Sequence, residues 1–563
     1  MKCKAIGPED ARILLVGEAP GENEERKGEP FCGASGAELS RMLHDAGIIR
    51  NECRIINVVP WRPPRNKIDY WFGNKTQAAK EGLPLICGKY PHYEILEGMK
   101  ELQAEIDQLK PELIIPVGNT SLWALTGQWS ISKWRGSMMQ ASKYKEAPID
   151  YNGCDPIIVP TYHPAAILRQ WYLRFIAVQD LRRAKKVLEH PEREALLNPK
   201  RELIVRPNAD QVLTMIDAWL AEADLGQLKL AVDIETRDQH IACIGLAADK
   251  HSAICIPLMS TTKPDGYWGL DEELLILDAL RRLLSHESVL LLGQNFLYDA
   301  QYLVRYLGCW IGCYADTMVM QGVCWPGMSK GLDFISSLYC EYYEYWKDEG
   351  KKWDPRYQNE EQLWLYNCLD CINTFENFEE LEKVLEARDL MEPFRFEMNL
   401  FEPVLATMLR GVKIDLKARE KMALDIMAEQ REYEEFFEHV IGDRVQASLK
   451  ASPWYRSPQQ TKALLYDEFG LPVIKHKSTK RPTTDDAALT QIAESNPLLA
   501  PLCHALMHYR SLGVYYNNFI TAKLRNGRIH CYYNLVGTET FRFASSKDAF
   551  DSGTNLQNIP RDE

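Results

Sequence analysis

Short apolar runs alternate with helical patterns in the first third of the chain. The runs at 13–16, 55–59, 113–117 and 156–160 are bounded by glycine, proline or polar residues, which is typical of short strands. Strands that alternate with helices predict an α/β domain. Functional residues of such a domain are expected just after its strands.

A second block of apolar runs leads into acidic residues. The run at 228–232 predicts a partly buried strand that ends in Asp233 and Glu235, whose side chains project to the same side because strand side chains alternate. The run at 289–293 turns into a helical pattern with Asp299 in its first turn. Acids placed together repel one another unless a cation joins them. The block therefore predicts a metal site.

A third segment supplies another acid and a tyrosine. Tyr366 and Asp370 are four residues apart in the helical pattern at 363–375, so they share one helix face. Each acid taken alone could be a helix cap or a solvated strand end, but the ordered set favours a site. Two divalent ions about 4 Å apart activate water and stabilise the leaving oxygen of a phosphodiester, and oxygen ligands suit Mg²⁺ or Mn²⁺.

These segments resemble the 3′-5′ proofreading exonuclease of the DnaQ-like superfamily, in the form attached to family A DNA polymerases, over residues 200–385. The resemblance implies an RNase H-like fold and two Mg²⁺ or Mn²⁺ ions. It also implies that Asn295 contacts the substrate and that Tyr366 positions the attacking water. The implied metal ligands, which are also catalytic, are Asp233, Glu235, Asp299 and Asp370.

Length and charge limit the remaining possibilities. A chain of 563 residues is too long for one core, which favours several domains. A net charge of −13 excludes a generally basic, DNA-coating protein but allows a local positive groove. The basic and aromatic stretch at 61–67 fits either a phosphate-contacting loop or a solvated turn.

Cysteine usage and hydropathy indicate a cytoplasmic protein. No apolar stretch is long enough to span a bilayer, so no membrane partner is expected. The fifteen cysteines have no regular spacing, which favours reduced thiols. Four of them could form a zinc site, although buried thiols packed as small apolar groups fit better. These four are Cys309, Cys313, Cys368 and Cys371.

The first predicted strand runs into residues 17–21, which lack both the dinucleotide-binding glycine spacing and the lysine of a phosphate loop. Together with 28–33, Asn57 and 163–169, this stretch resembles the motifs of the uracil-DNA glycosylase superfamily, and especially its iron-sulfur group, family 4. The resemblance implies an α/β domain over residues 1–195. The implied functional residues are Glu18 for water positioning, Phe31 for ring stacking, Asn57 for base reading and His163 for stabilising the uracil anion.

These side chains suit the chemistry. A base must leave the stack before its glycosidic bond can be reached, and Phe31 offers a face for the extruded ring. The Asn57 amide accepts from uracil N3–H and donates to O4, an arrangement that cytosine reverses. Glu18 can orient water and balance the charge of the sugar cation. The alternative is a module that binds uracil or DNA without cutting, in a chain that acts as an exonuclease subunit, but such a module could dispense with Glu18 and His163.

The cysteines depart from the family 4 pattern. Trp61 stands where the family has a cysteine, and the usual N-terminal pair is missing. Other cysteines do not restore four thiolates, so no iron-sulfur cluster is expected. These other cysteines are Cys3, Cys32, Cys53 and Cys87. The inserted stretch at 70–90 could take over the stabilising role of the cluster.

Long amphipathic helices are predicted beyond residue 390. Residues 410–415 and 482–485 resemble the thumb of family A DNA polymerases, and 527–530, 538–546 and 555–561 resemble the entry into the palm. The resemblance implies that residues 386–563 are mostly helical. It also implies that Arg542 faces the minor groove of a primer-template, with Asn555 and Gln557 nearby. Phe541 replaces a common family glycine.

The motifs that carry polymerase chemistry do not follow, so polymerisation is expected only with missing sequence or a separate C-terminal polymerase chain. The expected whole is the N-terminal part of a replicative polymerase of a bacterial virus, in the host cytoplasm. Its expected partner is DNA, as single-stranded 3′ ends and primer-template. The thumb-like region argues against the alternative of a stand-alone repair nuclease.

Overall fold

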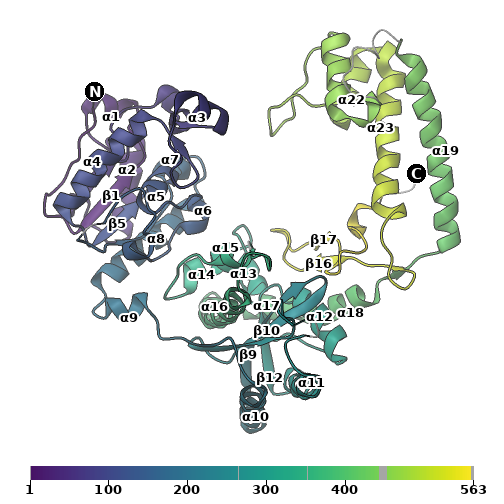
Figure 1. Cartoon of the computed structure of the whole chain (residues 1–563). Helices are drawn as coiled ribbons and strands as arrows, with labels where there is room; N and C mark the ends of the chain where they lie inside the picture. Colours follow the sequence, from purple (N-terminus) through teal and green to yellow (C-terminus); the bar gives the residue numbers. More distant parts are fainter. Residues whose placement is uncertain (1, 152, 264–265, 352, 443–452, 560–563) are drawn as a thin grey trace. The chain divides into compact units, whose positions relative to one another are not determined.

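The computed structural model describes residues 2–151, 153–263, 266–351, 353–442 and 453–559. Residues 560 and 561 of the last polymerase-like motif therefore lie outside the described residues. The chain forms two compact units, Met1–Asn399 and Leu400–Glu563, and each is considered by itself (Figure 1). No helix in the described ranges is long and apolar enough to cross a membrane.

The first domain of the first unit contains a five-stranded sheet of order β2-β1-β5-β7-β6. Strands β1, β2, β5 and β7 are parallel, and β6 runs antiparallel to β7. The bounds are β1 (Ile13–Gly17), β2 (Cys53–Asn57), β5 (Leu113–Pro116), β6 (Met139–Gln140) and β7 (Ile157–Ile158). The four apolar runs are thus strands of one sheet, which confirms the predicted α/β domain.

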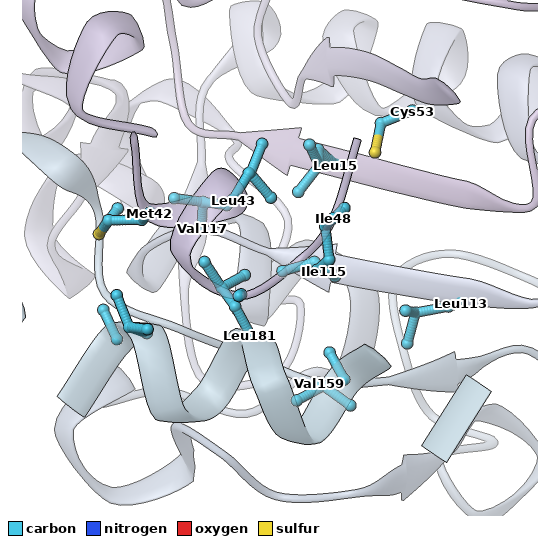
Figure 2. Close-up of a cluster of buried hydrophobic side chains, with 14 of the residues drawn as sticks. Leu15, Met42, Leu43, Ile48, Cys53, Leu113, Ile115, Val117, Val159 and Leu181 are labelled. Carbon is cyan, nitrogen blue, oxygen red and sulfur yellow. The ribbon is translucent and has the colours of Figure 1, made fainter. Parts of the chain in front are cut away.

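Helices bury both faces of this sheet. Leu15 packs with α2 (Ala34–Asp45) and α8 (Leu173–Glu189), in the core shown in Figure 2. Its neighbour Leu14 points to the other face, where the core includes α4 (Tyr93–Leu109) and α5 (Asn119–Thr126). Both faces are covered, so the strands are apolar throughout instead of alternating with polar residues.

Shorter elements complete this domain. A hairpin of β3 (Phe72–Gly73) and β4 (Tyr90–Pro91) encloses α3 (Lys75–Glu81) within the inserted stretch. The other helices are α1 (Glu22–Lys27), α6 (Ile131–Trp134), α7 (Pro164–Ile167) and α9 (Arg193–Leu197). Helix α9 leads from this domain to the next one. Its Leu196 and Leu197 are buried in the first core, so the helix is packed against this domain.

The second domain contains a six-stranded mixed sheet of order β13-β12-β9-β10-β11-β8. The bounds are β8 (Glu202–Ile204), β9 (Leu228–Arg237), β10 (His240–Ala247), β11 (Ser252–Pro257), β12 (Val289–Gly293) and β13 (Ala315–Asp316). Strands β9, β10 and β11 are antiparallel, whereas β12 pairs in parallel with β9. The long α16 (Glu360–Ala387) contacts β9, β10 and β11.

Other helices surround this sheet. They are α10 (Ala209–Leu225), α11 (Leu270–Leu284), α12 (Leu297–Leu307), α13 (Thr317–Cys324), α14 (Leu332–Tyr339), α15 (Lys347–Lys351) and α17 (Met391–Asn399). Helix α17 contacts α13 and α16, so the compact unit extends to Asn399, past the expected domain boundary at 385.

The second unit is mostly helical, as expected for this region. Its helices are α18 (Phe401–Arg410), α19 (Leu416–Val440), α21 (Pro458–Lys462), α22 (Asp486–Ser495) and α23 (Ala500–Tyr515). Two small sheets pair β14 (Val412–Lys413) with β15 (Arg528–Ile529), and β16 (Tyr532–Asn534) with β17 (Ala544–Ser546). Phe437 of α19 lies in an aromatic core with Trp454, Tyr455 and Tyr509.

Candidate active sites

Three of the predicted acidic residues meet where α16 crosses β9. Asp233 and Glu235 project from β9, and Asp370 projects from α16. One carboxylate oxygen from each lies within 4.8 Å of the others. Among the described residues, this is the one group of three or more cysteine, histidine or acidic side chains placed to hold a metal ion.

A glycine allows the helix to approach the sheet. Gly245 of β10 pairs with Asp233 in the strand register. A Cβ atom at Gly245 would lie 2.5 Å from Asn367 Oδ1 and 2.7 Å from Cys371 Sγ, both on α16. Only a residue without a side chain lets α16 bring Asp370 this close to β9.

Asn367 orients the first acid, and sequence reasoning missed it. Its Nδ2 donates to Asp233 Oδ2 at 2.8 Å and to the Asp233 carbonyl oxygen at 3.1 Å. The side chain is buried and follows Tyr366 directly in the chain. A polar residue on the same helix face as the third motif was the available signal.

Negative charge is crowded in this group of three acids. Burial and the neighbouring Asp370 raise the pKa of Asp233 to about 7. Burial, with Asp233 and Asp370 next, raises the pKa of Glu235 well above its usual value. Carboxylates held together against this repulsion supply the hard oxygen donors that a divalent cation needs, so the residues fit such an ion.

Asp299 lies beside this group and is not part of it. It stands in the first turn of α12, as predicted, and its Oδ1 accepts from the Ile234 backbone N–H at 2.9 Å. Burial and Asp233 raise its pKa well above the usual value. The structure thus brings three of the four predicted ligands together and places the fourth against the backbone between Asp233 and Glu235.

Asn295 lies in the turn that joins β12 to α12. Its φ of 59° is in the left-handed region. Asp316, at the N-cap of α13, fixes the turn by accepting from the backbone N–H groups of Asn295 at 2.9 Å and Phe296 at 2.8 Å. This acid therefore supports the second motif through the backbone.

Two residues missed by sequence reasoning contact Asp370 and Tyr366. Trp346 Nε1 donates to Asp370 Oδ1 at 2.6 Å. Lys347 Nζ lies 2.9 Å from the Tyr366 hydroxyl oxygen and donates to Asp370 Oδ2. Both precede α16 in a tyrosine-rich stretch, which offered no chemical signal in sequence.

The four residues predicted for base excision line a single cavity of about 460 Å³ in the first domain. Glu18 follows β1, Asn57 ends β2, and His163 lies just before α7. Phe31 joins them from the loop before α2. Parallel strands end at the same edge of the sheet, which explains why residues far apart in sequence meet there.

A strained loop presents Phe31 to the cavity. Its φ is 52°, in the left-handed region. Its N–H donates to Glu24 Oε1, and its carbonyl oxygen accepts from Arg50 at 3.0 Å. A Cβ at Gly17 would lie 2.2 Å from Asn57 Oδ1 and 2.7 Å from the Phe31 ring, so glycine is required there. Glu24 and Arg50 were missed in sequence because they act on the backbone.

The cavity presents defined hydrogen-bonding atoms. His163 Nδ1 accepts from the Ala165 backbone N–H at 3.1 Å, and burial lowers its pKa, so the ring is neutral with its proton on Nε2. Glu18 Oε1 accepts from the Thr120 N–H at 2.9 Å. Asn57 is buried, and its Nδ2 has no hydrogen-bond partner in the part of the chain that the structure describes.

Among the described residues, neither the four cysteines considered for zinc nor those considered for an iron-sulfur cluster are grouped so that they could hold a metal ion. Cys3 and Cys53 are buried, Cys32 is partly buried and Cys87 is exposed, and the absence of an iron-sulfur cluster stays a prediction. In the inserted stretch, the Phe72 ring packs edge-on against Trp123 and Trp129, with centroids 5.4 and 5.8 Å away.

Asn555 and Gln557, two of the three palm-like residues, meet at Ser545 in the second unit. The Ser545 hydroxyl contacts Asn555 Oδ1, and it lies 2.8 Å from Gln557 Oε1. Arg542 is exposed. Phe541 has a φ of 58°, in the left-handed region that glycine favours.

Comparison with known proteins covers each part of the chain. A family model described as uracil DNA glycosylase superfamily matches residues 4–186. A model described as 3′-5′ exonuclease matches residues 212–386, and one described as DNA polymerase family A matches residues 425–563.

Relatives of two kinds are found. The type-4 uracil-DNA glycosylase of Thermotoga maritima is 33% identical, over 32% of this chain and 79% of that protein. The DNA polymerase of Bacillus phage SP01 is 22% identical, over 99% of this chain and 64% of that protein. DNA polymerase I of Pseudomonas aeruginosa is 27% identical, over 68% of this chain and 41% of that protein. The chain thus spans less than two thirds of either polymerase.

The match to the Thermotoga maritima glycosylase is 33% identical and covers 79% of that protein. The three family models also follow one another in the order expected from the motifs. The chain therefore belongs to the uracil-DNA glycosylase superfamily through its N-terminal domain and carries 3′-5′ exonuclease and family A DNA polymerase domains after it.

Proposed function

We propose that the N-terminal domain excises uracil from DNA. The observation that carries this proposal is the buried Nδ2 of Asn57, which no described residue pairs, in a cavity that Phe31, His163 and Glu18 also line. An unpaired buried amide costs about 1–3 kcal/mol, which a ligand with a matching acceptor recovers. Uracil O4 is such an acceptor, and Asn57 Oδ1 can accept from N3–H at the same time.

The other residues fit the bond cleavage. The glycosidic bond breaks with its electron pair moving to uracil N1, so negative charge spreads onto O2. The Nε2–H of neutral His163 can donate to O2. Phe31, whose ring centroid lies 5.8 Å from that of His163, can pack on the uracil ring. Glu18 orients a water toward the sugar carbon and balances its positive charge. The water forms the new C–O bond, releases a proton to solvent and leaves an abasic site.

For the second domain we propose removal of nucleotides from DNA 3′ ends. Asp233, Glu235 and Asp370 would hold the divalent cation, with Asp299 as the fourth ligand for a pair of ions. Mg²⁺ or Mn²⁺, when bound, supplies activation of water and stabilises the leaving oxygen. Tyr366 positions the attacking water, and Asn295 contacts the terminal nucleotide.

For the second unit we propose a role in primer-template binding through Arg542, Asn555 and Gln557. The contacts of Asn555 and Gln557 with Ser545, and the exposure of Arg542, support this role. We propose polymerase activity only together with further palm and finger sequence or a partner chain that supplies it.

Uracil release in EDTA tests the glycosylase proposal. The chain is incubated with a labelled single-stranded oligonucleotide containing uracil, because EDTA silences a two-metal nuclease and leaves metal-free chemistry untouched. We expect abasic sites from the wild type and their loss in Glu18→Ala and in His163→Ala. If the wild type leaves uracil intact but binds the oligonucleotide, the domain is a recognition module and the proposal fails.

A further inference from the structure

Residues 342–348 connect the glycosylase domain to the exonuclease centre, and we name them the bridging segment. The segment leaves α14, passes the glycosylase domain and enters α15, ahead of α16. Its aromatic side chains Tyr343, Tyr345 and Trp346 are buried. They form one cluster with Tyr366 of α16, against which Trp134 of the glycosylase domain packs.

The glycosylase domain holds one side of this segment. The Trp134 ring lies 5.2 Å from the Tyr345 ring, centroid to centroid. Lys133 Nζ lies 2.8 Å from Asp348 Oδ1. Further contacts are the Tyr144 hydroxyl to Glu344 Oε1 at 2.6 Å, the Met138 N–H to the Tyr343 carbonyl oxygen at 2.7 Å, and the Tyr345 N–H to Ser137 Oγ at 3.1 Å.

The next two residues reach the exonuclease acids. Trp346 donates to Asp370, and Lys347 donates to Asp370 and to the Tyr366 hydroxyl oxygen. Adjacent Cα atoms are about 3.8 Å apart, so Tyr345 cannot shift without moving Trp346 and Lys347. Consecutive residues thus make the two sets of contacts, with no residue between them to absorb a displacement.

Buried charges fix the start of the segment. Arg135 is 1% exposed, and its Nη1 donates to Ser337 Oγ of α14 at 2.6 Å. Its partner in the glycosylase domain is the buried Asp180. Arg183 donates to the carbonyl oxygens of Ser337 and Cys340, both at 2.7 Å. If the domains separated, Arg135 would keep Asp180, but Arg135 and Arg183 would lose their bonds to Ser337 and Cys340, which favours a permanent contact.

We propose that the glycosylase domain positions Asp370 and Tyr366 through the bridging segment, with Trp346 and Lys347 as positioning residues of the exonuclease. This inference rests on the proposed exonuclease function. Trp346 fixes one oxygen of Asp370. Lys347 donates to the Tyr366 oxygen, which turns the hydroxyl proton away from the ammonium group. The exonuclease thus depends on the fold of the glycosylase domain and not on its chemistry.

The test uses the full chain with Trp134→Ala, Trp134→Phe, Lys347→Met and the double variant Trp134→Ala/Lys347→Met. Trp134 does not line the uracil cavity. Lys133→Met is a milder variant that removes the ion pair with Asp348. Lys145→Met is its matched control, because Lys145 is exposed in the same domain and no contact is described for it. Uracil release in EDTA verifies that the glycosylase domain is intact.

Two quantities are measured. One is Mn²⁺ affinity in the absence of DNA, from the electron paramagnetic resonance signal of free Mn²⁺. The other is the kcat and KM of digestion of single-stranded DNA. We expect Trp134→Ala to weaken Mn²⁺ binding and to lower kcat about tenfold or more, because small misplacements of catalytic groups have large effects. KM and uracil release stay near wild type, and Trp134→Phe restores both quantities.

The double variant separates positioning from general destabilisation. If Trp134 and Lys347 act along one path, the kcat of the double variant is no lower than that of the single variant with the lower kcat. Wild-type Mn²⁺ affinity and kcat in both Trp134→Ala and Lys133→Met would overturn the inference. Absence of DNA digestion by the wild type would instead count against the proposed exonuclease, and the Mn²⁺ titration would still decide the positioning role.

Discussion

Asn57 shows how a single amide can select a base. Its Nδ2 is buried at the end of β2 without a partner among the described residues, while Gly17 leaves room for its Oδ1. Thymine and uracil present the same hydrogen-bonding edge to such an amide, whereas cytosine presents the reverse. Under the proposed function, selection against cytosine is therefore the property that this residue would control.

Asn57→Asp replaces the donor by an acceptor of the same size. We expect uracil release to fall by about 100-fold or more, because a site built to hydrogen-bond a group rejects a mismatch strongly. The measurement is the rate of uracil release relative to cytosine release from matched oligonucleotides. An unchanged ratio would show that Asn57 does not read the base.

His163 gives a pH prediction. Burial lowers its pKa from the ordinary 6.5, so the neutral ring persists at and below that pH. Uracil release should therefore stay level as the pH falls from 8 to 6.5 and should decline only at more acidic values, when protonation of Nδ1 removes the acceptor for Ala165. A decline centred at 6.5 or above would contradict the neutral-donor role.

Asp233 is the acid that we expect the exonuclease to need most. Asp233→Asn keeps an acceptor for Asn367 and removes one charge from a crowded group. We expect DNA digestion to be abolished and the melting temperature of the metal-free chain to be unchanged or higher, because repulsion with Asp370 is relieved. Digestion and thermal unfolding in EDTA check this, and uracil release serves as the control. Retained digestion would remove Asp233 from the centre.

At the scale of elements, the exonuclease centre depends on how closely α16 packs on β10. Asp370 is carried by the helix and Asp233 by the neighbouring strand β9, so a small outward shift of α16 separates the carboxylates. Gly245 sets that distance, since its missing side chain is the space that Asn367 and Cys371 occupy.

Gly245→Ala should weaken both stability and catalysis. Overpacking of a close contact costs about 1–3 kcal/mol, and the shift of α16 should lower kcat for digestion more than it raises KM. Gly226→Ala is the matched control, because a Cβ there meets nothing within 4 Å and its φ of −174° suits any residue. Equal effects of the two substitutions on kcat would argue against the packing explanation.

At the scale of the whole molecule, the first unit joins two domains by buried polar contacts. The Arg135–Asp180 pair is buried on the glycosylase side and extends to Ser337 of the exonuclease domain. A buried pair adds little net stability, but removal of one partner leaves an unpaired charge.

Arg135→Leu should therefore destabilise the first unit by about 3–5 kcal/mol, and Asp180→Leu in the same chain should recover much of that loss. The measurement is denaturant unfolding of the full chain, with DNA digestion and uracil release followed in parallel. Because the domains share this contact, both activities should be lost in one transition. Separate transitions would indicate domains that fold independently.

Much of the fold followed from the sequence for a plain physical reason. Apolar runs such as 13–16 and 289–293 are strands, because short apolar runs bounded by glycine or polar residues suit strands that are covered on both faces. Asp299 lies in the first turn of α12, as its position predicted. The residues proposed to perform chemistry could also be selected from the sequence, because Asp233, Glu235 and His163 belong to short local patterns.

Tertiary structure alone decided the supporting contacts. Glu24 and Arg50 hold Phe31 through its backbone, and no local pattern marks a side chain that binds backbone far away. Lys347 and Trp346 reach Asp370 only because α16 folds back beside them and Trp134 of another domain packs against their neighbour. The sequence by itself determined which groups we propose to react, since the chemistry of a side chain is intrinsic to it. The tertiary structure decided how they are held, because that depends on distances between segments remote in the chain.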